Sequence, residues 1–170
     1  MGILEKWLMP DVMPEHFYEV TPEMVKSFGG KALICDIDNT LVTYDDPEPT
    51  EEVLKWIKNM NSAGIAISFV SNNDWERVEL FNKNLGFVAY AKSGKPFVKN
   101  LAAACRDLGI DKNEAVLLGD QLLTDCAAAK RFGIKAIIVP PIKDKTTLFF
   151  KTKRLIEKPY VAKFKRLNSK

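Results

Sequence analysis

The chain has 170 residues, of which 46% are apolar, and carries a formal net charge of +3. This length supplies one ordinary hydrophobic core, so we expect a single globular domain. The apolar runs are far shorter than about 18 residues, and charged residues interrupt the N-terminal one, which argues against a membrane-spanning helix and a secretory signal.

The cysteines indicate a reducing compartment. They are odd in number, lie in apolar surroundings and form no Cys-x-x-Cys pair: Cys35, Cys105 and Cys126. Thiols of this kind are typical of reduced core residues in cytosolic proteins. We therefore predict a cytoplasmic protein.

The positive charge is concentrated at the C-terminus. Residues 143–170 hold ten Lys/Arg and two acids, a local charge of +8, whereas the remaining 15 basic and 20 acidic residues give −5. Such a tail is typical of a solvated surface helix or a flexible arm, and it also suits contact with anionic lipid or nucleic acid. We predict three regions: an N-terminal helical extension at 1–30, a catalytic core at 31–142, and a basic helical or flexible tail at 143–170.

The N-terminal extension contains two predicted helices. The first would present an apolar face made of Ile3, Leu4, Trp7 and Leu8. The second begins at Thr21-Pro22-Glu23, where a capping residue precedes proline and an acid, and it ends at Gly29-Gly30. We expect both helices to pack on the core, and contact of the first face with a membrane surface or a partner is the alternative.

From residue 31 onward, predicted strands alternate with predicted helices. The strands are expected at 32–35, 65–70, 87–90, 115–118 and 134–139, and the helices at 51–63, 74–85, 96–108 and 126–132. This alternation predicts an α/β fold of three layers, in which helices cover both faces of a doubly wound parallel sheet of about five strands.

Polar side chains follow each of the first four predicted strands. In an open parallel sheet, the carboxyl ends of the strands form the edge at which ligands bind. Alternate residues of an extended chain point the same way, so Asp36 and Asp38 should project together from this edge. The complete candidate set is Asp36, Asp38, Ser71, Asn72, Lys95, Asp120 and Asp125.

These residue types suit phosphoryl transfer through an aspartyl nucleophile. We predict that Asp36 attacks phosphorus and that Asp38 is the general acid and base. A hydroxyl, an ammonium and an amide would bind the phosphoryl group: Ser71, Lys95 and Asn72. Mg²⁺ would balance the charge, with Asp36, Asp38 and Asp120 as ligands and Asp125 as a supporting acid.

Three other kinds of functional site are excluded by the spacing or the number of the residues that they require. An EF-hand loop that begins at Asp36 requires Gly at 41 and Glu at 47, where the chain has Leu41 and Pro47. A cysteine phosphatase requires Cys-x5-Arg, and Cys126 and Arg131 are one residue too close. A single histidine, His16, cannot form a histidine-rich zinc site.

The same motifs resemble those of the haloacid dehalogenase-like (HAD) phosphatases. The resemblance covers about residues 31–140 and rests on Asp36-Ile37-Asp38-Asn39-Thr40-Leu41, on Ser71, on Lys95-Pro96 and on the segment from Gly119 to Asp125. It implies that Asp36 is the nucleophile, that Asp38 is the acid/base and gives its backbone carbonyl to Mg²⁺, and that the last motif completes the ligand set. Dehalogenases of this superfamily lack the second Asp and ion pumps have Thr there, so Asp38 favours a phosphatase over these two classes, with a phosphomutase as the second alternative.

The short length and the N-terminal extension are similar to the YqeG-type branch of subfamily IIIA, which resembles the mitochondrial phosphatidylglycerophosphate phosphatases. These often have Lys where this chain has Ile37. Only 35 positions separate Asp36 from Ser71 and 24 separate Ser71 from Lys95, which leaves no room for a cap domain. An open site suits a large or surface-presented substrate.

We therefore expect hydrolysis of phosphatidylglycerophosphate, at the inner surface of the membrane, with the basic tail and the N-terminal face in contact with anionic lipid. Two alternatives stay open. One is a phosphatase of a soluble nucleotide, sugar phosphate or phosphoprotein. The other is a module without catalytic activity that binds RNA or the ribosome. The sequence does not indicate an oligomeric state.

Overall fold

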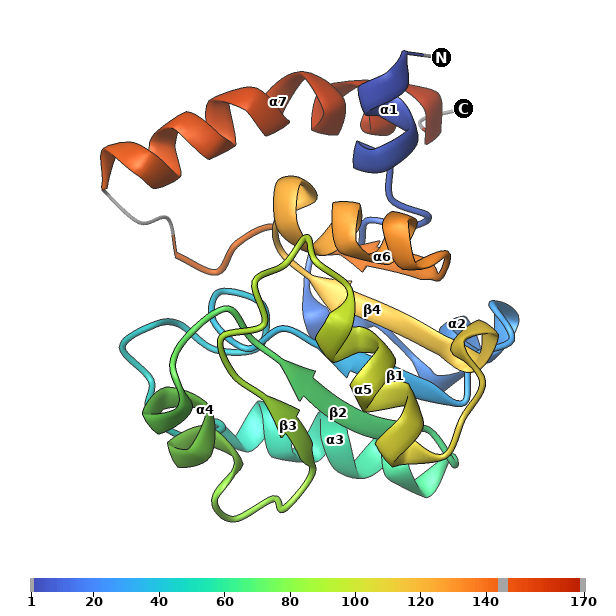
Figure 1. Ribbon diagram of the computed structural model, residues 1–170, viewed down its shortest axis with the longest axis vertical. Coiled ribbons are helices and arrows are strands. Elements are labelled where there is room, and N and C mark those ends of the chain that lie inside the picture. The colour runs from blue at the N-terminus through green and yellow to red at the C-terminus, as the bar shows by residue number, and fades with distance from the viewer. Residues whose placement is uncertain (1, 144–146, 169–170) are drawn as a thin grey trace.

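One parallel sheet forms the centre of the molecule. The computed structural model describes residues 2–143 and 147–168, and its five strands lie in the order β3-β2-β1-β4-β5 (Figure 1). Along the chain the elements are α1 (Ile3–Leu8), η1 (Phe17–Glu19), α2 (Pro22–Ser27), β1 (Ala32–Cys35), α3 (Glu51–Ser62), β2 (Ala66–Val70), α4 (Trp75–Asn82), β3 (Val88–Tyr90), α5 (Lys99–Leu108), η2 (Lys112–Glu114), β4 (Ala115–Gly119), η3 (Leu122–Cys126), α6 (Ala127–Phe132), β5 (Lys135–Ile138) and α7 (Leu148–Asn168). The predicted α/β fold with a parallel sheet is confirmed.

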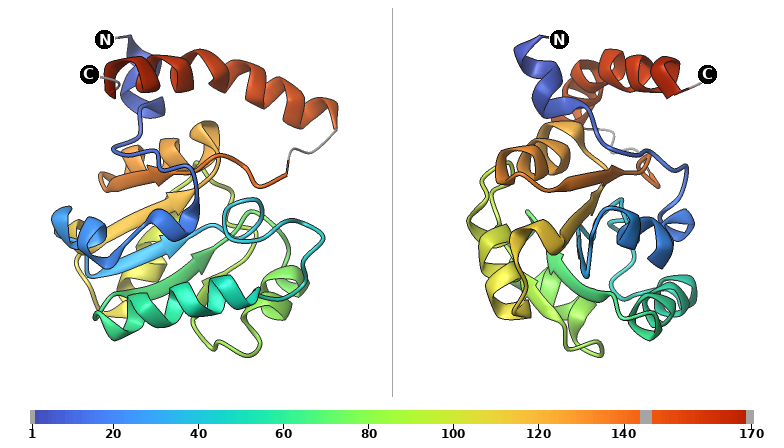
Figure 2. Two further views of the ribbon diagram at one scale, coloured as in Figure 1. Left: turned by 180° about the vertical axis from the view of Figure 1, so that it is seen from behind. Right: turned by 90° about the vertical axis from the view of Figure 1, so that its right-hand side faces the viewer.

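Helices cover both faces of the sheet because alternate strand residues point to opposite sides. On one face, Leu33 and Phe69 pack with residues of α2, α3 and α4. On the other face, Ile34 and Leu117 pack with residues of α1, α5 and α6. Figure 2 shows α3 and α5 on opposite sides of the sheet. The central strands are buried on both faces, which explains why their sequences are continuous apolar runs.

The order of the strands places the candidate residues at one edge. The chain runs from β1 through β2 to β3 and then returns to β4 beside β1, so the winding direction reverses between β1 and β4. Cys35 pairs with Leu118 in parallel register, and Asp36 donates its backbone N–H to the Leu118 carbonyl at 2.8 Å. The carboxyl ends of these two strands are therefore neighbours at the position where open α/β sheets bind ligands.

The strand limits agree with the sequence prediction to within one residue, but two helices are shorter than predicted. Helix α4 ends at Asn82, whose side chain bonds both the N–H and the carbonyl of Phe87. Helix α5 begins at Lys99 and not at Pro96, because a turn in which Phe97 N donates to Gly94 O comes first. No helix was predicted for residues 119–125, but Leu122–Cys126 forms a π-helical turn, in which the N–H groups of Asp125 and Cys126 donate to Gln121 O.

The N-terminal extension packs along the sheet and α3. Trp56 Nε1 of α3 donates to Val20 O at 2.9 Å, and the rings of Phe17 and Trp56 meet edge to face at 5.4 Å. Val12 forms a parallel bridge with Ile137, so the extension pairs with the edge strand β5 at this position. Asp11 secures this edge, since its carboxylate bonds Lys130 Nζ at 2.5 Å, Lys135 Nζ at 2.9 Å and the N–H of Ala136 at 2.9 Å.

We predict that Asp11→Asn lowers the free energy of unfolding by about 2 kcal/mol at pH 7, because a partly buried carboxylate loses two charged partners. Burial opposes the charged form of Asp11, but the bonds from Lys130, Ala136 and Lys135 outweigh it and lower its pKa below the ordinary 3.8. A carboxyl with a lowered pKa in the folded state stabilises fully above pH 3.8 and loses this contribution as the pH falls through the folded-state value.

Chemical denaturation at several pH values should therefore show the difference between wild type and Asp11→Asn at neutral pH and its disappearance in acid. Asp45→Asn is the matched control, because Asp45 and its partner Lys143 are 72% and 66% exposed and solvent screens their ion pair, so its loss should leave the stability nearly unchanged. Equal stability of Asp11→Asn and wild type at pH 7 would contradict the prediction.

The basic C-terminal segment forms the helix α7, which crosses the molecule above η3 and α6 and lies beside α1 (Figure 1). Ion pairs of Lys163 with Glu5 and of Lys165 with Glu15 connect it to the N-terminal extension. Within residues 2–143 and 147–168, no helix is both long and apolar enough for a membrane span. The three cysteines are buried and unpaired.

Candidate active site

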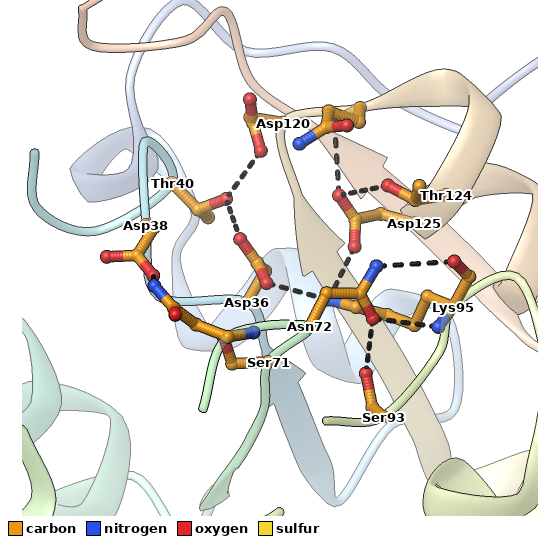
Figure 3. Close-up of polar contacts among 12 residues, drawn as sticks. Asp36, Asp38, Thr40, Ser71, Asn72, Ser93, Lys95, Asp120, Thr124 and Asp125 are labelled. Carbon is orange, nitrogen blue, oxygen red and sulfur yellow. Dashed lines mark hydrogen bonds and ion pairs between the residues drawn. The ribbon is translucent and has the colours of Figure 1, made fainter. Parts of the chain in front are cut away.

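Three carboxylates converge beyond the ends of β1 and β4. Asp36 follows β1, Asp120 follows β4, and Asp125 lies in η3. One oxygen from each lies within 4.8 Å of the others, and all three residues are buried. Figure 3 shows their carboxylates turned toward one another around Thr40 and the Lys95 ammonium. Clustered acids of this kind require positive charge, because burial and mutual repulsion both disfavour the ionised state.

Lys95 supplies one positive charge inside the cluster. Its Nζ lies 2.7 Å from Asp36 Oδ1 and 2.7 Å from Asp125 Oδ1, and its side chain is only 2% exposed. Burial alone would lower the pKa of Lys95, but the charges of Asp125 and Asp36 outweigh it and raise the pKa above the ordinary value. Lys95 is therefore an ammonium throughout the physiological range.

The loop that carries Lys95 is fixed by Asn72. The Asn72 side chain accepts from Ser93 Oγ at 2.6 Å and from Lys95 N at 2.7 Å, and it donates to Lys95 O at 3.2 Å. Ser71, at the end of β2, is buried, and its hydroxyl accepts from Asn73 N at 3.1 Å. Both Ser71 and Asn72 line the cavity described below, and their predicted contact with a phosphoryl group stays a prediction.

Asp38 lies at the same edge but its carboxylate faces α4. Asn73 Nδ2 donates to Asp38 Oδ2 at 3.0 Å, while Arg77 Nε donates to Oδ1 at 3.0 Å. The carboxylate cluster therefore differs from the predicted metal ligands in one member, because Asp125 takes part and the side chain of Asp38 does not. A contribution of Asp38 through its backbone carbonyl stays a prediction.

Thr40 connects the two strand ends. Its hydroxyl lies 3.3 Å from Asp36 Oδ2 and 3.4 Å from Asp120 Oδ1, and its single proton can be donated to only one of them at a time. Burial, with the charge of Asp125, raises the pKa of Asp120 despite the opposing effect of Arg154. Burial is also the main reason why the pKa of Asp36 is raised, although Lys95 opposes it.

The ligand atoms at this edge suit a divalent cation. Lys95 pairs with Asp36 and Asp125, and Arg154 pairs with Asp120. The converging groups of Asp36, Asp120 and Asp125 are carboxylates, whose oxygens Mg²⁺ prefers. The residues present therefore fit a Mg²⁺ ion held by Asp36, Asp120 and Asp125.

The cluster opens into a cavity of about 400 Å³ that is lined by residues of the core and of α7. Its walls include every predicted site residue except Asp120, together with Tyr44, Asn73, Gln121, Thr124, Phe150 and Lys153. Phe150 and Lys153 belong to α7, and the ring of Phe150 meets that of Tyr44 edge to face at 6.2 Å. The basic tail is thus part of this site, which the sequence analysis did not predict.

Sequence reasoning also missed the basic residues that hold the predicted acids. Arg77 lies on α4 and Arg154 on α7, 39 and 34 residues away from the aspartates that they bind. Neither stands in a motif, and a single sequence contains no signal that distinguishes them from the other surface arginines. The local spacing Asp74-x-x-Arg77 indicates only a capped helix start.

Gly119 allows Asp125 to approach the end of β4. A Cβ at position 119 would lie 2.4 Å from both Cβ and Cγ of Asp125. We predict that Gly119→Ala displaces Asp125 from Lys95 and costs about 1 to 3 kcal/mol of stability, as overpacking does in a buried site. Thermal unfolding with and without Mg²⁺ measures this, and a variant with unchanged stability and unchanged Mg²⁺ response would contradict it.

Together, the fold and the site define a protein with a Rossmann-like sheet and a carboxylate cluster at its switch point. A family model described as HAD-hydrolase-like matches residues 92–147. The chain is 35% identical over 164 residues to the probable phosphatase YqeG of Bacillus subtilis strain 168. This alignment covers 96% of the chain and 95% of YqeG. The chain therefore belongs to the HAD-like hydrolases, in their YqeG-type branch.

Solved structures show the same fold at low sequence identity. The cobalt-bound deoxy-D-mannose-octulosonate 8-phosphate phosphatase of Haemophilus influenzae superposes with a TM-score of 0.53 at 14% identity, over 82% of this chain and 91% of that one. An N-terminal part of a Bacteroides fragilis protein, which contains a phosphatase domain complexed with Mg, superposes with a TM-score of 0.52 at 20% identity. This superposition covers 79% of this chain and 40% of that one. The HAD-like fold expected from the motifs is confirmed.

Proposed function

We propose that the chain is a Mg²⁺-dependent phosphomonoester hydrolase that acts through an aspartyl-phosphate on Asp36. The observation that carries this proposal is the convergence of Asp36, Asp120 and Asp125 on one point, with Lys95 between two of them, in a member of the HAD-like hydrolases. A protein that only bound RNA or the ribosome would gain nothing from three buried carboxylates, which are costly to keep together.

Each residue of the site has its own role in the proposed reaction. Lys95 bonds Asp36 Oδ1 and so fixes the rotation of the carboxylate that attacks phosphorus. Lys95 and Ser71 line the cavity and would donate to the phosphoryl oxygens. Asp38 would protonate the leaving oxygen and then accept a proton from the attacking water. Mg²⁺, when bound, neutralises charge on the carboxylates and on the phosphoryl group.

The test is hydrolysis of p-nitrophenyl phosphate by the full chain. We expect phosphate release that requires Mg²⁺, that EDTA abolishes, and that added Mg²⁺ restores. A purified, folded protein without activity toward any phosphate ester in the presence of Mg²⁺ would contradict the proposal.

The favoured substrate is phosphatidylglycerophosphate, presented by the membrane to a site without a cap domain. Between β1 and β2 the structure contains only one loop and α3, and between β2 and β3 only α4, which supports an open site. A second cavity of about 580 Å³ lies beside Asp120. It is lined mainly by apolar residues, including Ile138, Val139, Leu155 and Val161, with Lys151, Lys158 and Lys165 among the charged ones.

The surface of α7 also suits anionic lipid. Four of its apolar side chains are exposed among its lysines and arginines: Leu148, Leu155, Ile156 and Leu167. A helix of this composition is typical of peripheral contact with a membrane surface. We therefore place the protein in the cytoplasm, at the inner surface of the membrane, as part of the same proposal.

The lipid hypothesis is tested with vesicles that contain phosphatidylglycerophosphate and phosphatidylglycerol. We expect phosphate release from these vesicles, and we expect Leu155→Asp to lower this rate about tenfold, because a charge replaces an apolar side chain that lines the cavity beside Asp120. The same variant should hydrolyse p-nitrophenyl phosphate at the wild-type rate. Good turnover of soluble esters with none of the lipid would favour the alternative, a phosphatase of soluble nucleotides, sugar phosphates or phosphoproteins.

A further inference from the structure

Arg154 of α7 binds Asp120 at two points. Its Nη1 donates to the Asp120 carbonyl at 2.9 Å, and its Nη2 forms an ion pair with Asp120 Oδ2. The Asp120 side chain is 0% exposed, so this contact takes place inside the protein and not at its surface. Because one planar guanidinium binds both the backbone carbonyl and one carboxylate oxygen of Asp120, it holds this carboxylate in a fixed direction relative to the main chain of the same residue.

Glu157 holds Arg154 in place. It accepts from Arg154 Nη1 at 2.9 Å through Oε2 and from Leu123 N at 2.9 Å through Oε1, and it is only 2% exposed. Leu123 lies in the first turn of η3, where backbone N–H groups have no partner within the helix. Glu157 therefore joins α7 to the segment that contains Asp125.

These contacts occupy one oxygen of Asp120 and leave the other directed inward. Oδ2 is taken by Arg154, whereas Oδ1 lies 3.4 Å from the Thr40 hydroxyl, which is also 3.3 Å from Asp36 (Figure 3). The inward oxygen is the one available to a cation shared with Asp36 and Asp125. Helix α7 thus determines the orientation of a residue that follows β4.

We infer that Arg154, supported by Glu157, is a positioning residue that turns Asp120 toward the metal site, so that α7 is required for Mg²⁺ binding. This inference rests on the proposed function, which supplies the metal. Two other roles for Arg154 give different results. If it only anchored α7, its loss would lower stability without changing Mg²⁺ affinity. If it only neutralised Asp120, its loss would strengthen Mg²⁺ binding, because the site would become more negative.

The experiment measures Mg²⁺ binding to the full chain by calorimetry, without substrate. We expect Arg154→Ala to weaken binding about tenfold, as loss of a residue that orients a metal ligand does. Arg154→Lys should give an intermediate loss, because an ammonium keeps the charge but cannot reproduce the two contacts with Asp120. Arg166→Ala makes the same chemical change at an exposed residue of the same helix, and this matched control should bind Mg²⁺ as wild type does.

Kinetics with p-nitrophenyl phosphate provide a second measurement. The activity of Arg154→Ala should require more Mg²⁺, and its KM for the ester at saturating Mg²⁺ should stay within about twofold of wild type. Unchanged or tighter Mg²⁺ binding by Arg154→Ala would overturn the inference and leave the proposed function intact. If Arg154→Ala does not fold, wild-type affinity of Arg154→Lys would overturn it. A wild-type chain that binds no Mg²⁺ would contradict both the inference on Arg154 and the proposed function.

Discussion

Asp36→Asn should abolish hydrolysis of p-nitrophenyl phosphate, with a loss of at least about a thousandfold, because an amide cannot attack phosphorus and form the acyl phosphate. The fold should persist, since Lys95 keeps its ion pair with Asp125 at 2.7 Å. We expect a change in the free energy of unfolding of no more than about 1 kcal/mol in the absence of metal.

The matched control for this variant is Asp45→Asn, which makes the same chemical change at an exposed residue. It should retain wild-type activity. Mass spectrometry of acid-quenched reactions provides an independent measurement, since wild type should carry a covalent phosphate that Asp36→Asn lacks. Activity of Asp36→Asn within tenfold of wild type would show that a different residue is the nucleophile.

The sequence predicted the sheet well because each parallel strand is a short apolar run that ends at polar loop residues. Burial on both faces removes any need for alternation, so the runs from Ala32 to Cys35 and from Ala115 to Leu118 stand out in the sequence. The convergence of Asp36 and Asp120 then follows from parallel pairing alone. Asp125 was less predictable, since its approach to Asp36 depends on the π-helical turn and on the missing side chain at Gly119.

The role of the C-terminal helix could not be predicted, because nothing local in the sequence identifies its partner. Residues 143–170 are strongly basic, which suits solvent or an anionic surface equally well. In the structure Glu157 is buried and Arg154 reaches Asp120, so the segment contributes a wall of the site. Such contacts depend on how α7 packs against η3, which is tertiary information that a single sequence does not contain.

Lys95→Met should have the largest effect on stability. It removes the ammonium from between Asp36 and Asp125, whose side chains are 10% and 1% exposed, and leaves two buried acids without this partner. Breaking a buried ion pair in this way costs about 3 to 5 kcal/mol. The charges of Asp125 and Asp36 raise the pKa of Lys95 above its ordinary value, so Lys95 is an ammonium at neutral pH and the loss should be present throughout the neutral range.

Adding Asp125→Asn to Lys95→Met separates this electrostatic cost from lost packing. The double variant removes one of the two abandoned charges, so we expect it to recover about 2 kcal/mol relative to Lys95→Met alone, a coupling typical of residues in contact. Mg²⁺ should stabilise Lys95→Met more than wild type, because Asp36 then lacks its ammonium partner. Neither variant should hydrolyse p-nitrophenyl phosphate, since both lack the donor beside Asp36. Denaturant unfolding of Lys95→Met, Asp125→Asn and the double variant, with and without Mg²⁺, measures these changes in stability. Strictly additive effects of the two substitutions would show that Lys95 and Asp125 do not interact.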